Sequence, residues 1–410
     1  MKILIYGINF DPELIGVGKY TTEMAEFLAL KHEVRVVAAI PYYPAWKPGQ
    51  GYSSWRYRSR AHKGIKVIHC PLWVPGTLSG FNRIIHLFSF ALSSFWVVLF
   101  QGIFWRPEAV LTVAPSMSCA LGGWLAARLA GACAWLHFQD LELDVAEAIG
   151  LVRNKALLKA AHFVERLLIA LFDVVSAISP AMCGRVAAKG VSAQKTVLFP
   201  NCVDTRAIYP LPDPQSCRGA MGIPDGKIVA LYSGNLGGKQ GLDIMPKAAV
   251  LLRDRPDILF VICGEGGYRG TLECASAGLG NVVFMNLQPA GRLNILLNAA
   301  HIHLLPQRNE VADYVMPSKL FGMLASGRPV VAVAAPGSTV GDIVDQCGVL
   351  VAPGDVRAFA QAVQDLADDE QRRGRMGDSG RALAQEMFES GSVLGQFEQK
   401  LSERCQPLCR

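Results

Sequence analysis

A histidine and three carboxylates follow one apolar run of the sequence. His137 ends the run Cys133–His137, and Asp140, Glu142 and Asp144 come directly after it. At the carboxyl end of a buried strand, these residue types can supply acid, base and hydrogen-bonding groups to a sugar or a phosphate. A structural role for the histidine at the strand corner is the competing interpretation. His137 and Asp140 are therefore the candidate catalytic residues.

A glycine-containing turn near the start of the chain can approach an anionic ligand. The segment 7–20, GINFDPELIGVGKY, lies between an apolar run and a helical pattern and contains Gly16 and Gly18. Glycines let the backbone come close to a ligand, and a helix start favours anions. The loop is too long for the dinucleotide fingerprint GxGxxG, and a turn that merely needs small residues remains the alternative.

Two later glycine-rich turns and one helix start carry groups that bind a pyrophosphate. The turn 232–241 places a lysine among four glycines, and the turn 264–267 follows the next apolar run. The helix start at 317–320 offers a hydroxyl, an ammonium and backbone N–H groups. Neither turn has the GxxxxGK[ST] pattern of a P-loop, and tight turns or a plain N-cap are the structural alternatives. The predicted donor-site residues here are Asn235, Lys239, Gly264, Glu265, Ser318, Lys319 and Leu320.

The elements that must position these residues form two similar series. Apolar runs alternate with helical patterns on both sides of a proline-rich stretch at 204–225. Such runs predict parallel strands covered on both faces, hence an α/β protein of two tandem doubly wound, Rossmann-like domains facing a cleft. We expect the domains at 1–205 and 206–380, with a C-terminal helix at 381–410 that packs back on the first. The expected strands are 2–8, 34–40, 66–70, 109–113, 133–137, 173–178, 196–199, 227–232, 258–263, 282–285, 302–305, 329–334 and 349–351.

Composition and cysteine usage indicate an ordinary globular protein in a reducing compartment. The chain has 410 residues, 51% hydrophobic and 18% charged, which excludes disordered and low-complexity classes. Its eleven cysteines include no CxxC pair and lie mostly in apolar stretches, while Cys405 and Cys409 fall in a tail expected to fray. We therefore expect free thiols, no structural zinc and no disulfide framework. The start of the chain lacks a secretory signal, so the predicted location is cytoplasmic.

Positive charge is concentrated in the first half of the chain. Residues 1–205 hold 20 basic and 13 acidic residues, against 20 and 21 in 206–410. No acidic residue occurs between Glu33 and Glu108, an interval with nine basic residues. Basic and aromatic residues alternate there and suit either nucleic acid or anionic lipid. An apolar helix within the interval favours lipid, so no nucleic-acid partner is expected. The predicted acceptor and membrane residues are Trp55, Arg56, Arg58 and Trp96.

That apolar helix covers Ile84–Trp105. Sixteen of its 22 residues are apolar, and at 1.5 Å per residue it would be about 33 Å long. Its polar residues fall on one narrow stripe: His86, Ser89, Ser93, Ser94 and Gln101. A membrane-spanning helix would divide the first α/β unit, and a buried core helix is a second interpretation. A helix seated in the membrane interface is favoured, because basic and aromatic residues flank it.

In sequence order, several segments resemble family 4 glycosyltransferases of the GT-B fold. They are GINFDPELIGVGKYTTEMAEFLA, HFQDLELD, SAIS followed by FPNCVD, SGNLGGKQGLD, GEGG and PSKLFGMLASGRPVVA. The N-terminal block with PYYPAWKPGQGYSSWRYR is similar to the WcaI type of colanic-acid exopolysaccharide transferase. The resemblance implies retaining transfer from a nucleotide-sugar without metal or other cofactor. It favours a GDP-sugar, GDP-fucose among them, over a UDP-sugar.

The resemblance also implies roles for particular residues. Lys239 and the helix start Ser318–Leu320 would hold the diphosphate, and Gly16 would approach it from the other domain. His137 and Asp140 would face the transferred sugar. The implied acceptor is a polyprenyl-diphosphate-linked oligosaccharide at the inner face of the cytoplasmic membrane, with the enzyme peripherally attached.

Two departures from the family pattern weaken this assignment. Asn235 stands where many relatives have an arginine. Tyr314 and Gly322 stand where many have a pair of glutamates, one of which holds the donor ribose. Glu310 and Asp313 are nearby substitutes for that carboxylate. A UDP-sugar epimerase of the same fold, or an inactive sugar-nucleotide-binding scaffold, therefore stays as an alternative.

Overall fold

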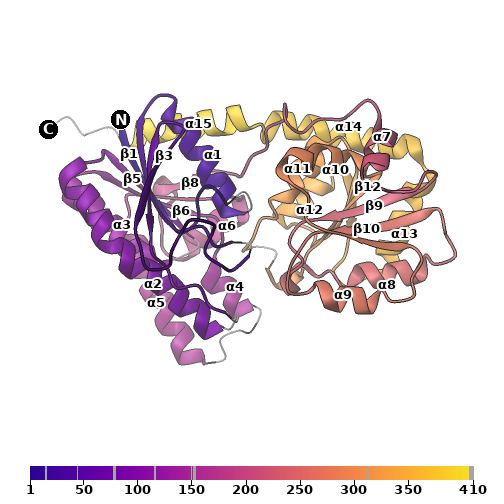
Figure 1. Cartoon of the computed structure of the whole chain (residues 1–410), viewed down its shortest axis with the longest axis horizontal. Helices are drawn as coiled ribbons and strands as arrows, with labels where there is room; N and C mark the ends of the chain where they lie inside the picture. Colours follow the sequence, from indigo (N-terminus) through magenta and orange to yellow (C-terminus); the bar gives the residue numbers. More distant parts are fainter. Residues whose placement is uncertain are drawn as a thin grey trace. The chain divides into compact units, whose positions relative to one another are not determined.

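Two units make up the chain, and each has its own sheet. The computed structural model describes residues 1–13, 16–43, 45–76, 80–114, 117–148, 150, 154–311 and 314–405, with only the backbone of Lys239 and Val311. Unit 1 consists of Met1–Pro200 with Leu394–Arg410, and unit 2 of Asn201–Val393. The sequence analysis had placed the division after residue 205. In Figure 1 unit 1 is drawn mainly in indigo and magenta, and unit 2 mainly in orange.

The sheet of unit 1 is eight-stranded in the order β3-β4-β2-β1-β5-β6-β7-β8. Its central strands are buried on both faces, as their continuous apolar runs predict; Ile3, Leu4 and Ile5 of β1 are fully buried. Apart from β3 with β4, its neighbouring strands pair in parallel among the described residues. The strands are β1 (Lys2–Gly7), β2 (Glu33–Ala39), β3 (Arg58–His62), β4 (Ile65–Cys70), β5 (Ala109–Ala114), β6 (Cys133–Phe138), β7 (Val174–Ala177) and β8 (Thr196–Leu198).

β3 is not predicted from the sequence, whose apolar runs indicate parallel strands throughout. It runs antiparallel to β4 at the edge of the sheet and is mostly polar and exposed. The two strands are joined by Lys63 and Gly64, both with positive φ (45° and 83°). Two consecutive residues with positive φ form a type I′ turn, whose backbone twist matches the right-handed twist of the two strands in a hairpin. The antiparallel pairing of β3 makes the sheet mixed. β3 has no apolar run because a strand at the edge of a sheet is not buried on both faces.

Helices cover both faces of this sheet. On β6, Trp135 faces α15 (Ser390–Arg404), and its ring lies 5.4 Å from that of Phe397. On β5, Thr112 faces α3 (Ala120–Ala130), where a Cβ on Gly123 would lie 2.0 Å from the Thr112 Oγ1. Thr112 pairs in register with Leu136, the neighbour of Trp135, so α3 and α15 lie on opposite faces. The other helices are α1 (Val17–Ala29), α2 (Gly80–Phe100), α4 (Glu142–Ala148), α5 (Lys155–Ala170) and α6 (Pro180–Ala188).

α2 turns its polar stripe toward the protein and its apolar side toward solvent. The Ser94 Oγ lies 2.7 Å from the Tyr6 hydroxyl, and the Gln101 Oε1 accepts a hydrogen bond from Arg35. The helix continues as one turn of π-helix, Gln101–Trp105, and the segment Gly80–Trp105 is long and apolar enough to cross a membrane. Only 28% of its most apolar window is buried, so a buried core helix is excluded.

Unit 2 has a six-stranded sheet in the order β11-β10-β9-β12-β13-β14. Its described strands pair in parallel. They are β9 (Ile228–Ser233), β10 (Ile258–Cys263), β11 (Val282–Met285), β12 (Ile302–Pro306), β13 (Val330–Val333) and β14 (Gly348–Val351). The helices are α7 (Pro214–Ala220), α8 (Ile244–Leu251), α9 (Arg269–Ala275), α10 (Leu293–Ala299), α11 (Lys319–Ala325), α12 (Thr339–Val344), α13 (Val356–Asp368) and α14 (Glu370–Met387).

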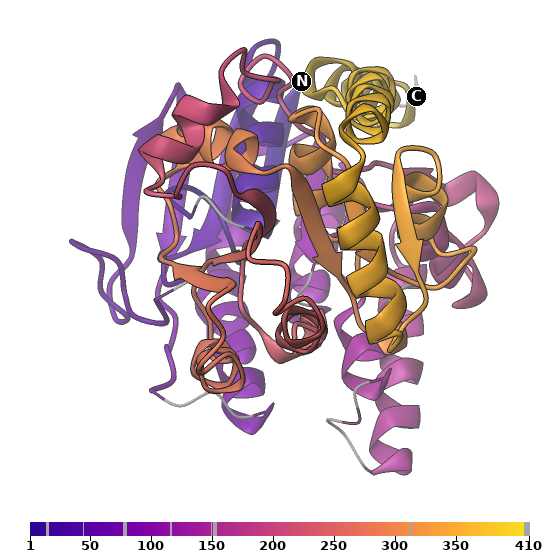
Figure 2. The same cartoon turned by 90° about the vertical axis from the view of Figure 1, so that its right-hand side faces the viewer.

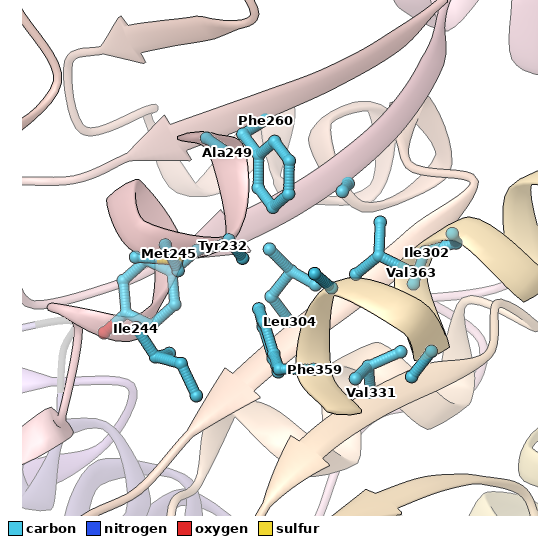
Figure 3. Close-up of a cluster of buried hydrophobic side chains, with 14 of the residues drawn as sticks. Tyr232, Ile244, Met245, Ala249, Phe260, Ile302, Leu304, Val331, Phe359 and Val363 are labelled. Atoms are coloured by element: carbon cyan, nitrogen blue, oxygen red, sulfur yellow. The ribbon is translucent and has the colours of Figure 1, made fainter. Parts of the chain in front are cut away.

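Alternate residues of β9 face two separate hydrophobic cores. Ala230 and Tyr232 pack with residues of α8 and α13, the cluster drawn in Figure 3, whereas Val229 and Leu231 pack with residues of α7 and α10. This period of two is expected for a strand with helices on both faces. Figure 2, in which unit 2 faces the viewer, shows helices on both sides of its strands. The proline-rich stretch 204–225 contains α7, whose N-terminus is capped by the side chain of Asp213 and whose first residue is Pro214.

The C-terminal segment differs from the expected single helix in two respects. α14 ends at Met387 and α15 begins at Ser390, with an isolated bridge between Val203 and Glu389 at the break. From Leu394 onward α15 belongs to unit 1, where Phe397 stacks on Phe199 at 3.9 Å between ring centroids. Cys405, expected in a frayed tail, is buried and forms a disulfide with Cys133. Cys409 lies outside the described residues.

Candidate active site

In unit 2 the turns after β9 and β10 meet through their backbones. Gly234 and Gly264 have φ values of 137° and 155°, a region that glycine adopts without strain. A Cβ on Gly264 would lie 1.8 Å from the Gly234 carbonyl oxygen, and one on Gly266 would lie 2.3 Å from that of Leu236. The Leu236 N–H donates to the Glu265 carbonyl at 2.8 Å. The glycines therefore let the two turns form one continuous surface at the carboxyl ends of the strands.

Lys319, the first residue of α11, points its ammonium group at this surface. Its Nζ donates a hydrogen bond to the Tyr232 hydroxyl at 2.5 Å and lies 3.0 Å from the position a Cβ would take on Gly234. Among the described side chains no carboxylate pairs with it. Burial lowers the pKa of Lys319 to about 7. A partly desolvated ammonium without a counter-ion beside a glycine turn can accept an anionic ligand.

Tyr232 was not among the predicted site residues. It is fully buried in β9, burial raises its pKa, and its hydroxyl donates to the Asn235 carbonyl at 2.8 Å. The hydroxyl therefore connects the lysine to the glycine turn. Its position in an apolar run made it indistinguishable from a core aromatic in the sequence.

The other predicted donor residues are placed around this pair with differing exposure. Asn235 and Glu265 are exposed, and the Glu265 carboxylate lies 3.1 Å from Arg269. Ser318 precedes α11 without a side-chain capping bond to it. Leu320 is fully buried, so it can offer a ligand only its backbone. The side chain of Lys239 lies outside the described residues, although its backbone forms a short 3-10 turn, Gly238–Gln240.

The structure describes only some of the residues that were considered as binding groups for the donor ribose. Glu310 is exposed, and Tyr314 is partly buried and has an interaction partner. Asp313 lies outside the described residues. Gly322 is inside α11, where a Cβ would lie 3.4 Å from Leu297. That Glu310 or Asp313 replaces the carboxylate which holds the donor ribose in many relatives stays a prediction.

In unit 1 the turn after β1 is held by a buried carboxylate. Glu13 accepts hydrogen bonds from the backbone N–H groups of Tyr42 and Tyr43 at 2.7 and 2.8 Å. The Asn9 side chain donates to it at 2.6 Å. Burial raises the pKa of Glu13 and these hydrogen bonds oppose that rise. Glu13 thus ties the turn to the segment after β2, a role that the sequence did not reveal.

The predicted glycines of this turn lie just before and within α1. Gly16 has φ 62° and ψ −137°, and a Cβ there would meet nothing within 4 Å. A Cβ on Gly18 would lie 2.7 Å from the Glu13 carbonyl oxygen. Gly16 therefore allows the backbone conformation found at this position, and Gly18 allows the turn to approach the helix closely.

His137 is enclosed by its own unit. It is the penultimate residue of β6 and is 2% exposed, and its Nδ1 lies 2.9 Å from the Ser176 Oγ. Nε2 lies 2.9 Å from the Gln139 side-chain nitrogen, so Gln139 donates to it and Nδ1–H donates to Ser176. Burial lowers the pKa of His137 to about 3. With this pKa the imidazole is neutral at physiological pH and can act as a hydrogen-bonding group, and its catalytic role stays a prediction.

Asp140 follows β6 and lies partly exposed before α4. The neighbouring Glu142 forms an ion pair with Arg83 at 2.6 Å, and the charges of Glu142 and Asp140 both raise the pKa of Arg83. Asp140 thus belongs to a small charged group at the carboxyl edge of the unit 1 sheet. Within the described part of the chain, no three His, Cys, Asp or Glu residues are placed to hold a metal ion.

The predicted acceptor and membrane residues are on the surface of unit 1. Trp55 and Trp96 are 85% and 71% exposed, and Arg56 is exposed. Arg58 packs over the Tyr52 ring and donates to the Gly51 carbonyl at 2.5 Å. The structure thus brings Lys319 and the glycine turns together in unit 2, while His137 and Asp140 share the end of β6 in unit 1.

Two family models match consecutive parts of the chain. Residues 16–202 match the model described as glycosyl transferase 4-like domain, and residues 215–383 match the model of glycosyl transferases group 1. The glycosyl transferase WcaI of Escherichia coli (strain K12), assigned by name to colanic acid biosynthesis, is 40% identical over 375 residues, covering 89% of this chain and 91% of that protein.

More distant proteins are similar over nearly the whole chain. A GDP-mannose-dependent α-(1-6)-phosphatidylinositol monomannoside mannosyltransferase of Mycolicibacterium smegmatis is 28% identical over 93% of both chains. The crystal structure of Anabaena HepE in complex with UDP-glucose superposes with a TM-score of 0.71 at 17% identity, covering 98% of this chain and all of that one. The structural neighbours are GT-B glycosyltransferases, so the fold expected from the sequence is confirmed.

Proposed function

Since the chain belongs to the group 1 and 4-like glycosyltransferase family, we propose that it transfers a sugar from a nucleoside-diphosphate donor to a polyprenyl-diphosphate-linked oligosaccharide. The proposed process is exopolysaccharide synthesis of the colanic-acid kind, at the inner face of the cytoplasmic membrane. The observation that carries the proposal is the Lys319 ammonium, which has no carboxylate partner among the residues that the structure describes and faces the glycine turns after β9 and β10.

Lys319 would stabilise the negative charge of the departing nucleoside diphosphate. A preorganised donor aimed at developing charge in a water-poor site lowers the barrier without reorganising during the reaction. The ammonium is held by Tyr232 and by its own helix, so it is preorganised. We propose retaining transfer without a metal, since this cation can do the electrostatic work. His137, as a neutral hydrogen-bonding group, and Asp140 would orient the transferred sugar.

A GDP-sugar, with fucose as the first candidate, is the proposed donor. The name of the mycolicibacterial relative specifies GDP-mannose, whereas HepE was crystallised with UDP-glucose. The mycolicibacterial mannosyltransferase supports a guanine nucleotide in the donor, because this relative is similar in sequence over nearly the whole chain.

The outward apolar face of α2 supports peripheral attachment to the membrane. The residues on this face and its continuation in the π-helical turn are large and half or more exposed: Phe81, Ile84, Phe88, Leu92, Trp96, Phe100 and Phe104. The polar stripe is bonded to the unit 1 sheet, so the helix can lie in the interface while the α/β unit stays intact. Exposed Trp55, Arg56 and Arg58 would contact lipid headgroups and the acceptor.

The test is a transfer assay with the full-length protein and membrane vesicles that carry the lipid-linked acceptor. GDP-fucose, GDP-mannose, UDP-glucose and UDP-N-acetylglucosamine are supplied separately, each with EDTA. We expect lipid-linked product from a GDP-sugar, undiminished by EDTA and greatly reduced in Lys319→Met. Free sugar without lipid-linked product would indicate the epimerase alternative, and donor binding without any product would indicate a scaffold.

A further inference from the structure

α5 has an apolar face that the rest of its unit leaves uncovered. Leu157, Phe163, Val164 and Leu167 are between 52% and 63% exposed. The buried residues of this 16-residue helix are Leu158, Glu165 and Ile169, so it rests on the protein along one narrow stripe. Helices of soluble proteins normally turn their apolar side inward. Four large side chains facing solvent mark a surface for an apolar partner.

The exposed residues of α5 are segregated by chemistry. At 100° per residue, the four apolar side chains fall within an arc of about 120°, and exposed Ala156 and Ala160 lie in the same arc. Three basic residues lie in one row along a flank of this arc: Lys155, Lys159 and Arg166. An apolar face flanked by basic residues is the arrangement of helices that lie in the interface of an anionic membrane.

A cavity opens beside this row of basic residues. It has a volume of about 540 Å³ and lies between α4, α5 and α6. From α5 it is lined by Lys159, His162, Phe163 and Arg166, so Phe163 belongs both to its wall and to the apolar arc. A group held in the cavity mouth would therefore lie directly next to whatever covers the arc.

The acidic residues of the cavity already have partners. Asp144 pairs with Lys189 at 2.5 Å, and Glu147 pairs with His162 at 2.7 Å. Glu165 contacts both Lys189 and His162. Lys159 and Arg166 pair with no carboxylate among the residues that the structure describes. These two cations at the cavity wall are available to an anion.

We propose that α5 is a second membrane-binding helix and that Lys159 and Arg166 hold the phosphate of an anionic phospholipid headgroup at the mouth of this cavity. The inference rests on the membrane attachment proposed for α2, and extends it to another helix and to a lipid chemistry. α3 contacts both α2 and α5 and exposes Leu121 and Leu129, so apolar residues continue across this layer of unit 1. A surface that extends over α2, α3 and α5 fits a bilayer better than a single peptide.

The test is flotation of the full-length protein with two kinds of vesicle, phosphatidylcholine alone and phosphatidylcholine mixed with phosphatidylglycerol. We expect the wild type to prefer the anionic vesicles. The double variant Lys159→Glu/Arg166→Glu should lower its partition coefficient on them by about tenfold or more. Lys247→Glu/Arg253→Glu makes the same charge change at exposed positions of unit 2 and should leave partitioning unchanged.

A second pair of substitutions tests the apolar arc. Phe163→Ser/Leu167→Ser should weaken binding to both kinds of vesicle, because it removes apolar area rather than charge. Equal binding of the wild type to both vesicles, or equal losses in the α5 and unit 2 charge variants, would overturn the proposal. No binding to vesicles together with a dimer in sedimentation would show that a second copy covers the face, and would also overturn it.

Donor-induced thermal stabilisation of the same proteins separates this inference from the proposed function. The α5 charge variant should keep the full stabilisation by donor, which also shows that it is folded. If the wild type gains no stability from any donor but still prefers anionic vesicles, the proposed transfer fails and the lipid site stands.

Discussion

In unit 2 the turns after β9 and β10 are joined by backbone contacts between glycines, whereas in unit 1 the turn after β1 is held by the side chain of Glu13. The first arrangement places the ammonium group of Lys319 beside the turns, with a pKa that burial lowers to about 7. Elsewhere in unit 1, hydrogen bonds with Ser176 and Gln139 enclose the imidazole of His137. The comparison indicates that the turns of unit 2 offer charge to a ligand, whereas the turn after β1 in unit 1 is fixed by hydrogen bonds to a buried side chain.

The largest effect is expected from adding a methyl group where the two glycine turns meet. Gly264→Ala would place its Cβ 1.8 Å from the Gly234 carbonyl oxygen, so the backbone must move. We expect a loss of about 3 kcal/mol or more in the unfolding free energy of unit 2, with loss of donor binding. Denaturant unfolding measures this. Gly267→Ala, whose Cβ would meet nothing within 4 Å, is the control and should change stability by less than about 0.5 kcal/mol.

The corresponding change in unit 1 is at Glu13. Glu13→Ala removes the acceptor of two backbone N–H groups, and we expect it to cost about 2–3 kcal/mol in the unfolding free energy of unit 1. Glu13→Gln keeps one oxygen for those N–H groups and should cost less than half as much. Similar losses in both variants would mean that the negative charge, rather than the hydrogen bonds, holds the turn.

The lysine of unit 2 should make nucleotide binding depend on pH. With a pKa of about 7, Lys319 is mostly neutral at pH 8 in the free protein and becomes charged when a diphosphate binds. Binding should therefore take up close to one proton at pH 8, and affinity should weaken by up to about tenfold per pH unit above pH 7. Calorimetry in buffers of different ionisation enthalpy measures the uptake. Lys319→Met should abolish it.

The same lysine should leave a signature in stability without ligand. Its pKa in the folded protein lies below the ordinary value near 10.4, so the unfolded chain binds more protons between about pH 7 and pH 10. Stability should rise with pH across this window in the wild type and rise less in Lys319→Met. An identical pH dependence in both proteins would mean that the ammonium is well solvated.

The smallest effect is expected at the start of α1. Gly16 has a positive φ but open space around its Cβ position, so Gly16→Ala carries a conformational cost without a clash. Because φ 62° with ψ −137° is a conformation that residues with a Cβ rarely adopt, we expect a loss of about 1–2 kcal/mol in the unfolding free energy. A loss as large as that of Gly264→Ala would show that the turn is packed against groups beyond those described.

Strands and turns that depend on residues close together in the sequence could be predicted from it. Continuous apolar runs gave the central strands, and glycines after β9 and β10 marked turns that need close approach. β3 was missed because an exposed edge strand needs no apolar run. The two C-terminal helices were merged because the break at Phe388–Glu389 depends on contacts with Val203.

Partners distant in sequence could not be predicted. Tyr232 meets Lys319 across 87 positions, and Glu13 meets Tyr42 across 29. Cys133 and Cys405, separated by 272 positions, were expected to be free thiols. In each case the side chain is ordinary for its local pattern, and its role comes from the tertiary fold.

The most direct test of the account is donor-induced thermal stabilisation at pH 7 in the wild type, in Lys319→Met and in the surface control Lys247→Met. A donor at 100 times its dissociation constant should stabilise the wild type and the control by about 2.7 kcal/mol. Lys319→Met should show much less stabilisation at the same concentration. Equal stabilisation in all three proteins would contradict the assignment of the Tyr232–Lys319 pair as the diphosphate site.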